Sequence, residues 1–306
     1  MSQCTLAAAA KINLYLRILG PRSDGYHNVA MVLQSVTLRD VLHLSTQNRK
    51  EISITCDHPQ VPTDHSNLAV RAAQLLAEAY PKQATGVAIH IEKHIPVAAG
   101  LAGGSSNGAA VLVGLNHLWG LGLTLGELQD YATRLGSDMP FCLQGGTALG
   151  TGRGEILEPL PPLSGGAVVL AKFQDLSIST PWAYRTYAEQ FGHTFALASV
   201  QESDHFVQIL ASHSLSEIAA HLHNDFEKVV LPAYPQIQEL KERLLNTGAL
   251  GSLLSGSGPT VFALYEDLTL AKQAVTKLKN DYSDVDFFVA EFCHWGIQLL
   301  PYSNPF

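Results

Sequence analysis

Charge and cysteine are scarce in this sequence, and their scarcity excludes several classes of protein. Only 15% of the 306 residues are charged, and 19 lysines and arginines face 27 aspartates and glutamates. Because no basic run stands out, we expect neither a nucleic-acid partner nor an anionic membrane surface as partner. The four cysteines lie far apart and form no Cys-x-x-Cys, which is typical of reduced, mostly buried thiols in a cytosolic protein rather than of a disulfide framework or a zinc site.

Long apolar runs and leader sequences are missing as well. No stretch reaches the roughly 18 apolar residues of a membrane-spanning helix, and residues 1–10 lack the basic start and the apolar core of a signal or transit peptide. We therefore expect a cytoplasmic protein of the bacterial type, with a plastid location only if a transit peptide has been removed. The length of 306 residues predicts two domains, each able to bury a core.

The most informative stretch is the glycine-rich segment 96–107, which reads Pro-Val-Ala-Ala-Gly-Leu-Ala-Gly-Gly-Ser-Ser-Asn. Alternation over 87–92 predicts a strand before it, and helical spacing over 109–119 predicts a helix after it, with N-cap residue types at 105–107. Such a loop at a helix N-terminus can hold phosphate. It fits neither the Walker A motif, whose lysine it lacks, nor the dinucleotide fingerprint. A tight packing turn is the alternative, and the serine pair favours anion binding.

Two further places in the sequence combine polar residues with a defined local structure. Lys11 and Asn13 share one face of a predicted strand over 6–19, where an exposed polar face would explain them equally. Asp138 stands in front of a Met-Pro pair and is either a functional carboxylate or the cap of a short helix.

The turn-rich loop 20–25 leads to an adjacent aromatic residue and imidazole, Tyr26 and His27. Such a pair can stack on a planar base and hydrogen-bond its edge. A strand start and a surface histidine explain the two residues just as well.

The remaining pattern places further elements along the chain. A capping box, Thr124 with Glu127, predicts a helix that ends with Gly136 at its C′ position. The Pro- and Gly-rich stretch 159–166 predicts a linker. Other strands are predicted over 29–44, 51–56, 167–171, 250–254, 260–265 and 286–292, and helices over 64–79 and 268–278. After the linker, the order strand, helix, strand, strand, helix, strand indicates a ferredoxin-like sandwich.

Together the strand around Lys11, the glycine-rich loop and a late Ser-Gly-Ser-Gly-Pro turn at 255–259 resemble the GHMP kinase superfamily of small-molecule kinases. Within it, three segments resemble the branch that acts on 4-diphosphocytidyl-2-C-methyl-D-erythritol: Ala10-Lys11-Ile12-Asn13-Leu14, Arg22-Ser23-Asp24-Gly25-Tyr26-His27 and Gly136-Ser137-Asp138-Met139-Pro140-Phe141. The resemblance extends from residue 6 to about residue 262. It implies a two-domain α+β fold, with a ribosomal-protein-S5-like ATP-binding domain over 1–162 and a ferredoxin-like domain over 163–306 that closes the substrate cleft.

The resemblance also implies an activity and a set of site residues. The activity is phosphoryl transfer from ATP, with Mg²⁺, to the 2-hydroxyl of that cytidylated sugar alcohol in the non-mevalonate route to isoprenoid precursors, by a monomer or weak homodimer. Asp138 would be the base, and Lys11 would orient it and steady the developing charge. The implied ATP contacts are Pro96, Val97, Ala98, Ala99, Gly100, Leu101, Ala102, Gly103, Gly104, Ser105, Ser106, Asn67 and Lys93. The implied substrate contacts are Asn13, Tyr26, His27, Thr180 and Tyr184. The metal ligands stay open, with Ser105 and Ser106 as candidates.

Two departures and three alternatives accompany this resemblance. Leu33 stands where relatives often have an aromatic residue, so packing around the substrate is expected to differ. The loop has Ala98, Ala99 and Ala102 where relatives carry more glycine, and we expect Ala102 to keep a negative φ. A kinase of the homoserine or mevalonate type would not need the Tyr-His pair. A related ATP-dependent decarboxylase would also carry the lysine and the aspartate. A non-catalytic, ligand-binding member would not need them, and both are present.

Overall fold

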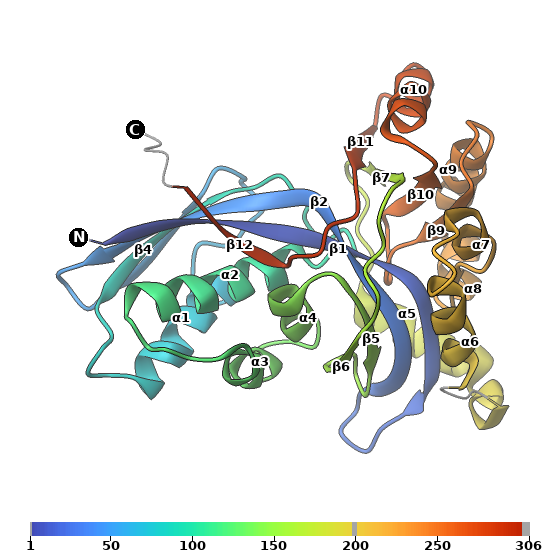
Figure 1. The fold of residues 1–306 in the computed structure, drawn as a ribbon. Coiled ribbons are helices and arrows are strands. Elements are labelled where there is room, and N and C mark those ends of the chain that lie inside the picture. Colours follow the sequence, from blue (N-terminus) through green and yellow to red (C-terminus); the bar gives the residue numbers. More distant parts are fainter. Residues whose placement is uncertain (1, 198–200, 302–306) are drawn as a thin grey trace.

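The computed structural model describes residues 2–197 and 201–301, which form two β-sheets and the helices that cover them (Figure 1). The strands are β1 (Gln3–Pro21), β2 (His27–Gln47), β3 (Ile52–Cys56), β4 (Gly86–Glu92), β5 (Thr147–Thr151), β6 (Ile156–Pro159), β7 (Ala167–Phe173), β8 (His223–Asn224), β9 (Gly251–Leu254), β10 (Val261–Tyr265), β11 (Val285–Ala290) and β12 (Ile297–Leu300). The helices are α1 (Leu68–Ala79), α2 (Gly103–Leu118), α3 (Leu125–Thr133), α4 (Met139–Gln144), α5 (Thr180–Phe191), the 3₁₀ helix η1 (Gly192–Leu197), α6 (Gln201–Leu210), α7 (Leu215–Ala220), α8 (Glu227–Ala233), α9 (Pro235–Leu245) and α10 (Leu268–Leu278).

The first sheet is built on the long antiparallel hairpin of β1 and β2. Its main path runs β12-β1-β2-β4-β3, and the hairpin of β5 and β6 joins it through β2. Helices α1 to α4 cover one face of this sheet, as Figure 1 shows. They bury a core in which alternate residues of β4, Val87, Ile89 and Ile91, meet Ala109 and Leu112 of α2. The alternation that predicted a half-buried strand before the glycine-rich loop is therefore confirmed.

The helix signals in this half of the sequence were partly right. The capping box is present, because the Thr124 side chain accepts from the Glu127 amide and the Glu127 carboxylate accepts from the Thr124 amide at 2.8 Å. Gly136 was predicted as the C′ residue, which is wrong: α3 ends with Arg134 as its C-cap, and Gly136 has no positive φ. The chain leaves the helix in a right-handed conformation, for which glycine is not needed.

The second sheet has the order β11-β7-β10-β9, with all neighbours antiparallel. Numbered within the unit, this order is 4-1-3-2, so the predicted ferredoxin-like arrangement is confirmed. Both faces of the sheet are buried. Val169 of β7 lies in a core with α9 and α10, whereas Val168 and Leu170 lie in a core with Ile12 and Leu14 of β1.

The outer edge of β1 is bordered by segments from the second half of the chain. β12 pairs with residues 5–8, and β8 pairs in parallel with Tyr15 and Leu16. The predicted division at 162/163 stays a prediction, but β12 follows the ferredoxin-like unit and still belongs to the first sheet. Within the part of the chain that the structure describes, no helix combines the length and hydropathy that a membrane crossing requires.

Candidate active site

Lys11 occupies the gap that β12 and β8 leave along the edge of β1. There its amide donates to the carbonyl of Leu101 at 3.1 Å, so the glycine-rich loop attaches to the strand at this residue. The Lys11 side chain is buried, and its Nζ donates to Asn13 Oδ1 at 2.8 Å and to the Gly100 carbonyl at 2.9 Å. Asp138 Oδ2 lies 4.0 Å from the same nitrogen. The fold thus brings Asp138 next to Lys11 and Asn13, although it lies more than 120 residues further along the sequence.

Asp138 stands at the N-cap position of α4 without capping it. Its backbone has a right-handed helical conformation, and its side chain makes no capping hydrogen bond. The interpretation of Asp138 as a simple helix cap is therefore wrong. Its carboxylate is 37% exposed and faces the same space as Lys11. Tyr184 lines the same cleft. Burial, and to a smaller extent the negative charge of Asp138, raises the pKa of the Tyr184 phenol.

The glycine-rich loop has an alternating backbone course. Positive φ values occur at Ala98 (51°), Gly100 (75°) and Ala102 (57°), and α2 begins directly afterwards at Gly103. The expectation of a negative φ at Ala102 was wrong. So was the placement of the N-cap at 105–107, because Ala102 is the N-cap and makes no side-chain capping bond. Alternating left-handed residues turn backbone N–H groups toward one concavity, which is a favourable environment for an anion.

The loop is held from behind by the turn that follows β9. Ser255 Oγ donates to the Gly100 carbonyl at 3.1 Å. A Cβ at Gly100 would lie only 2.2 Å from the Ser255 carbonyl oxygen, so the two segments touch backbone to backbone. The Nδ2 of Asn224 donates to the carbonyls of Leu254 and Gly256, at 2.8 Å each. The Gly100 carbonyl is thus held by Ser255 and by Lys11 Nζ, and glycine at position 100 is required sterically.

Beside Asn224, a buried carboxylate ties the second half of the chain to β1. Asp225 is fully buried and accepts from the Ile18 amide at 2.9 Å, from His223 at 3.1 Å and from Lys228 at 2.8 Å. Burial acts to raise the pKa of this carboxyl, but the hydrogen bonds and the positive charge outweigh it. The pKa of Asp225 therefore lies well below its ordinary value.

A cleft with a volume of about 1160 Å³ opens in front of Lys11 and Asp138. The predicted site residues that line it are Lys11, Asn13, Tyr26, His27, Asn67, Lys93, Pro96, Val97, Ala98, Ala99, Gly100, Ala102, Gly103, Gly104, Ser105, Asp138, Thr180 and Tyr184. Leu101 and Ser106 do not line it. Leu101 is buried in a hydrophobic core, and Ser106 Oγ donates to the Ala9 carbonyl at 2.7 Å. Of the two serines, only Ser105 faces the cleft.

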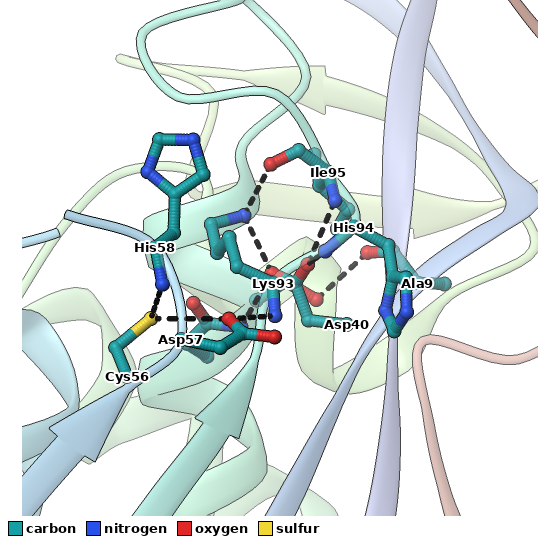
Figure 2. Close-up of polar contacts among 10 residues, drawn as sticks. Ala9, Asp40, Cys56, Asp57, His58, Lys93, His94 and Ile95 are labelled. Atoms are coloured by element: carbon teal, nitrogen blue, oxygen red, sulfur yellow. Dashed lines mark hydrogen bonds and ion pairs between the residues drawn. The ribbon is translucent and has the colours of Figure 1, made fainter. Parts of the chain in front are cut away.

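Two of the predicted ATP contacts already use their polar atoms within the protein. Asn67 caps α1, because its Oδ1 accepts from the Ala69 amide at 2.8 Å while its Nδ2 donates to the Pro62 carbonyl at 2.7 Å. The Nζ of Lys93 donates to Asp40 Oδ2 at 2.7 Å, as Figure 2 shows. Both residues line the cleft, but the structure gives each of them a structural role as well.

Aromatic side chains form the other end of the cleft. His27 stacks on Tyr184 with ring centroids 4.9 Å apart, and Tyr184 packs edge-on against Phe226 at 4.8 Å. Tyr26 is 54% exposed, and the guanidinium of Arg153 lies 4.8 Å above its ring. Burial lowers the pKa of His27, so the imidazole is neutral at pH 7. Its buried Nε2 has no hydrogen-bond partner among the described residues.

Thr180, a predicted substrate contact in the first turn of α5, contacts the Ser-Gly-Ser-Gly-Pro turn at 255–259. Its Oγ1 lies 2.8 Å from Ser257 Oγ, at hydrogen-bond distance. The roles of Thr180 and of the other predicted site residues stay predictions, but the fold gathers most of them around one cleft.

Comparison with known proteins identifies the family. Residues 67–146 match the GHMP kinases N terminal domain, and residues 206–284 match the GHMP kinases C terminal domain. The 4-diphosphocytidyl-2-C-methyl-D-erythritol kinase of a Synechococcus strain is 55% identical over 305 residues, which cover 98% of this chain and 97% of the relative. The chain belongs to this kinase family. The corresponding kinase of Acaryochloris marina is 51% identical, with 98% of this chain and 100% of the relative covered.

Solved structures confirm the two-domain α+β fold of GHMP kinases. A crystal structure of 4-(cytidine 5'-diphospho)-2C-methyl-D-erythritol kinase has a TM-score of 0.74 at 31% identity and covers 94% of this chain and 98% of its own. Homoserine kinase from Cytophaga hutchinsonii has a TM-score of 0.77 at 20% identity, with 98% of both chains covered. The fold is thus shared between branches with different substrates, and sequence identity separates them. This protein is therefore an ATP-dependent kinase that acts on a small molecule.

Several residues of this kinase that shape the site escaped prediction. They are Asp40, Asn107, Arg153, Asn224 and Ser255. Asp40 had a weak signal in the sequence, since it is a lone carboxylate inside a predicted strand. Asn107 and Ser255 lie in segments that the sequence pattern had singled out, 96–107 and 255–259, but they were not predicted as site residues. Arg153 and Asn224 act through contacts between distant segments, which no local pattern predicts.

Proposed function

We propose that this kinase transfers the γ-phosphoryl group of ATP to the 2-hydroxyl of 4-diphosphocytidyl-2-C-methyl-D-erythritol. The observation that carries the proposal is the position of the Lys11 and Asp138 pair, 4.0 Å apart, in a cleft with a phosphate-type loop and an aromatic cluster. The loop supplies a place for the nucleotide phosphates, and His27 with Tyr184 supplies one for a planar base. The identity to relatives with this name supports the choice of substrate.

In the proposed reaction, Asp138 accepts the proton of the 2-hydroxyl while the hydroxyl oxygen bonds to the γ-phosphorus. The bond between that phosphorus and the β,γ-bridging oxygen breaks, and ADP leaves. The ammonium of Lys11 forms an ion pair with Asp138, which orients the carboxylate. Two of its three N–H bonds are directed to Asn13 and Gly100, which fixes the direction of the third. General base assistance of this kind contributes roughly 10²–10⁴-fold, and positioning supplies much of the rest.

The backbone of the loop holds the triphosphate in this proposal. The first N–H groups of α2, from Gly103 onward, lack intrahelical partners and point toward the cleft end of the helix. Among the described residues, no cluster of three or more acidic, histidine or cysteine side chains could hold a metal ion by itself. This fits Mg²⁺, which binds mainly through nucleotide phosphates with one or two protein ligands. Ser105 and Asp138 line the cleft and would hold it, and the ion would neutralise phosphate charge.

The aromatic end of the cleft suits the cytosine ring. We assign Tyr26 to one face of the ring and His27 to its polar edge, with Tyr184, on which His27 is stacked, closing the other side of the base site. The unpartnered Nε2 of the neutral His27 supports this assignment, because a buried polar atom without a partner is costly unless a ligand completes it.

ADP release tests the proposal, measured side by side with the cytidylated substrate, mevalonate and homoserine. We expect turnover of the cytidylated substrate alone. A uridine analogue of the substrate should be used far less well, since His27 reads the edge of the base. Turnover of mevalonate in place of the cytidylated substrate would refute the proposal, and release of CO₂ would indicate the related decarboxylase reaction.

A further inference from the structure

A single buried carboxylate gathers the two flanks of the phosphate loop. Asp40 lies in β2 and is fully buried. Its Oδ1 accepts from the amides of His94 and Ile95, at 2.8 Å each. Its Oδ2 accepts from Lys93 Nζ at 2.7 Å and from Asn107 Nδ2 at 2.8 Å. Figure 2 shows the first three of these partners converging on Asp40 from the segment that leads into the loop.

The four partners are distributed along the chain in an informative way. Residues 93–95 come directly before the loop, and Asn107 comes directly after Ser106. At the same exit, Ser106 donates to Ala9 of β1. The entrance and the exit of the loop are therefore fastened to the central hairpin of the first sheet, the entrance by Asp40 and the exit by Asp40 and Ala9.

The position of Lys93 shows why a full negative charge is needed there. A Cβ at Gly103 would lie 2.9 Å from Lys93 Nζ, so the ammonium lies beside the first residue of α2. A helix N-terminus carries partial positive charge, and a buried cation next to it is unfavourable. The negative charge of Asp40 compensates both the ammonium charge of Lys93 and the partial positive charge of the helix N-terminus. The donors at the start of α2 then stay available for an anion in the cleft.

The loop between these two fastened ends has an unfavourable backbone conformation. Ala98 and Ala102 are alanines with left-handed φ values, a conformation that persists only when the surroundings enforce it. The turn at Ser255 holds the middle of the loop through Gly100, and Asp40 holds its ends.

We infer that Asp40 is a positioning residue for phosphoryl transfer. It keeps the loop in the course in which its amides converge on the triphosphate, and it acts on ATP only through its partners, the loop and the cleft-lining side chains of Lys93 and Asn107. The inference rests on the proposed function, because it takes the loop to be the ATP site. A purely structural role would instead make Asp40 one buried polar residue among several, with no selective effect on nucleotide binding.

The substitution Asp40→Asn tests the inference. Asparagine has the same shape, but its NH₂ group cannot accept from Lys93 and Asn107. We expect the dissociation constant of the non-hydrolysable analogue β,γ-imido-ATP to rise roughly 10- to 100-fold, the effect of a small misplacement of positioning groups. CDP binds at the aromatic end in the proposed function, and its dissociation constant should change less than about 2-fold because no contact of Asp40 reaches that end. The KM for ATP should rise together with the dissociation constant of β,γ-imido-ATP.

The matched control is Leu278→Ala, which removes a buried side chain of α10 far from the cleft and lowers stability without touching the loop. It should lower the melting temperature and leave both dissociation constants unchanged. If Asp40→Asn weakens neither ligand, or weakens both alike, the inference is wrong. If Asp40→Asn does not fold, Asp40→Glu, which keeps the negative charge but displaces the carboxylate from its four partners, decides by the same selective loss of the ATP analogue. A wild-type protein that fails to bind the ATP analogue would refute the proposed function instead.

Discussion

Replacing Ala98 by glycine should stabilise this kinase, although glycine usually weakens a fold. Ala98 has a φ of 51°, and its side chain is exposed, so the substitution removes no buried methyl group. An alanine in the left-handed region costs about 1–2 kcal/mol, which glycine does not pay. The greater conformational freedom of glycine in the unfolded chain lowers the free energy of unfolding by about 0.5–1 kcal/mol. The difference is a net stabilisation of about 0.5–1 kcal/mol.

A matched substitution with the opposite sign makes this prediction sharp. Ala77→Gly is the same chemical change, but it lies inside α1, where glycine costs about 1 kcal/mol. In thermal unfolding, Ala98→Gly should raise the melting temperature by about 2 °C and Ala77→Gly should lower it by a similar or larger amount. A melting temperature that falls equally in both variants would contradict the left-handed course of the loop, and with it the account of how its amides converge.

Three further predictions concern catalysis, substrate binding and pH. Asp138→Asn should lower kcat by about 10²–10⁴-fold while β,γ-imido-ATP still binds. The control Asp130→Asn, which changes an exposed carboxylate on α3, should alter neither kcat nor binding of the analogue. An unchanged kcat in Asp138→Asn would show that Asp138 is not the base. Arg153→Leu should raise the KM of the cytidylated substrate about 2- to 5-fold and leave the KM for ATP unchanged, because Tyr26 loses a cation–π contact of about 0.5–1 kcal/mol. A change in the KM for ATP alone would contradict the assignment of the cytosine site. The depressed pKa of Asp225 stabilises the fold above the pKa of unfolded aspartate, about 4, and this contribution is lost as the pH falls through the lower folded value. In urea unfolding, the stability advantage of the wild type over Asp225→Asn should therefore shrink below about pH 4, and an advantage that grows there would refute the assignment.

The sequence predicted the elements of this fold better than the connections between them. Alternation in β4 and the spacing in α10 follow from which side chains a sheet or a helix must bury, and both are local properties. The 4-1-3-2 order of the second sheet followed from the order of its elements, because few ways of packing such a chain exist. The outer edge of β1 could not be predicted, since β8 and β12 reach it from more than 200 residues away.

The candidate site shows the same division between local and distant information. Lys11 and Asp138 were found through their motifs, but only the fold places them 4.0 Å apart. Asp40 was missed because a lone carboxylate in a strand carries no local sign of its four partners. At Ala102, residue preference predicted a negative φ, and the fastened loop enforces the opposite. Residue identity alone is a poor guide where tertiary contacts set the backbone.

The pairing of β12 with β1 also has a consequence for how the protein is made. A ribosome delivers β1 first and β12 only after the whole ferredoxin-like unit. Until then, the outer edge of β1 exposes unpaired amides and carbonyls over residues 5–8, and an open strand edge invites pairing with other chains. The nascent chain therefore carries this aggregation hazard through most of its synthesis. Expression of residues 1–162 alone would make the hazard permanent, whereas a circular permutant that starts with β12 would remove it.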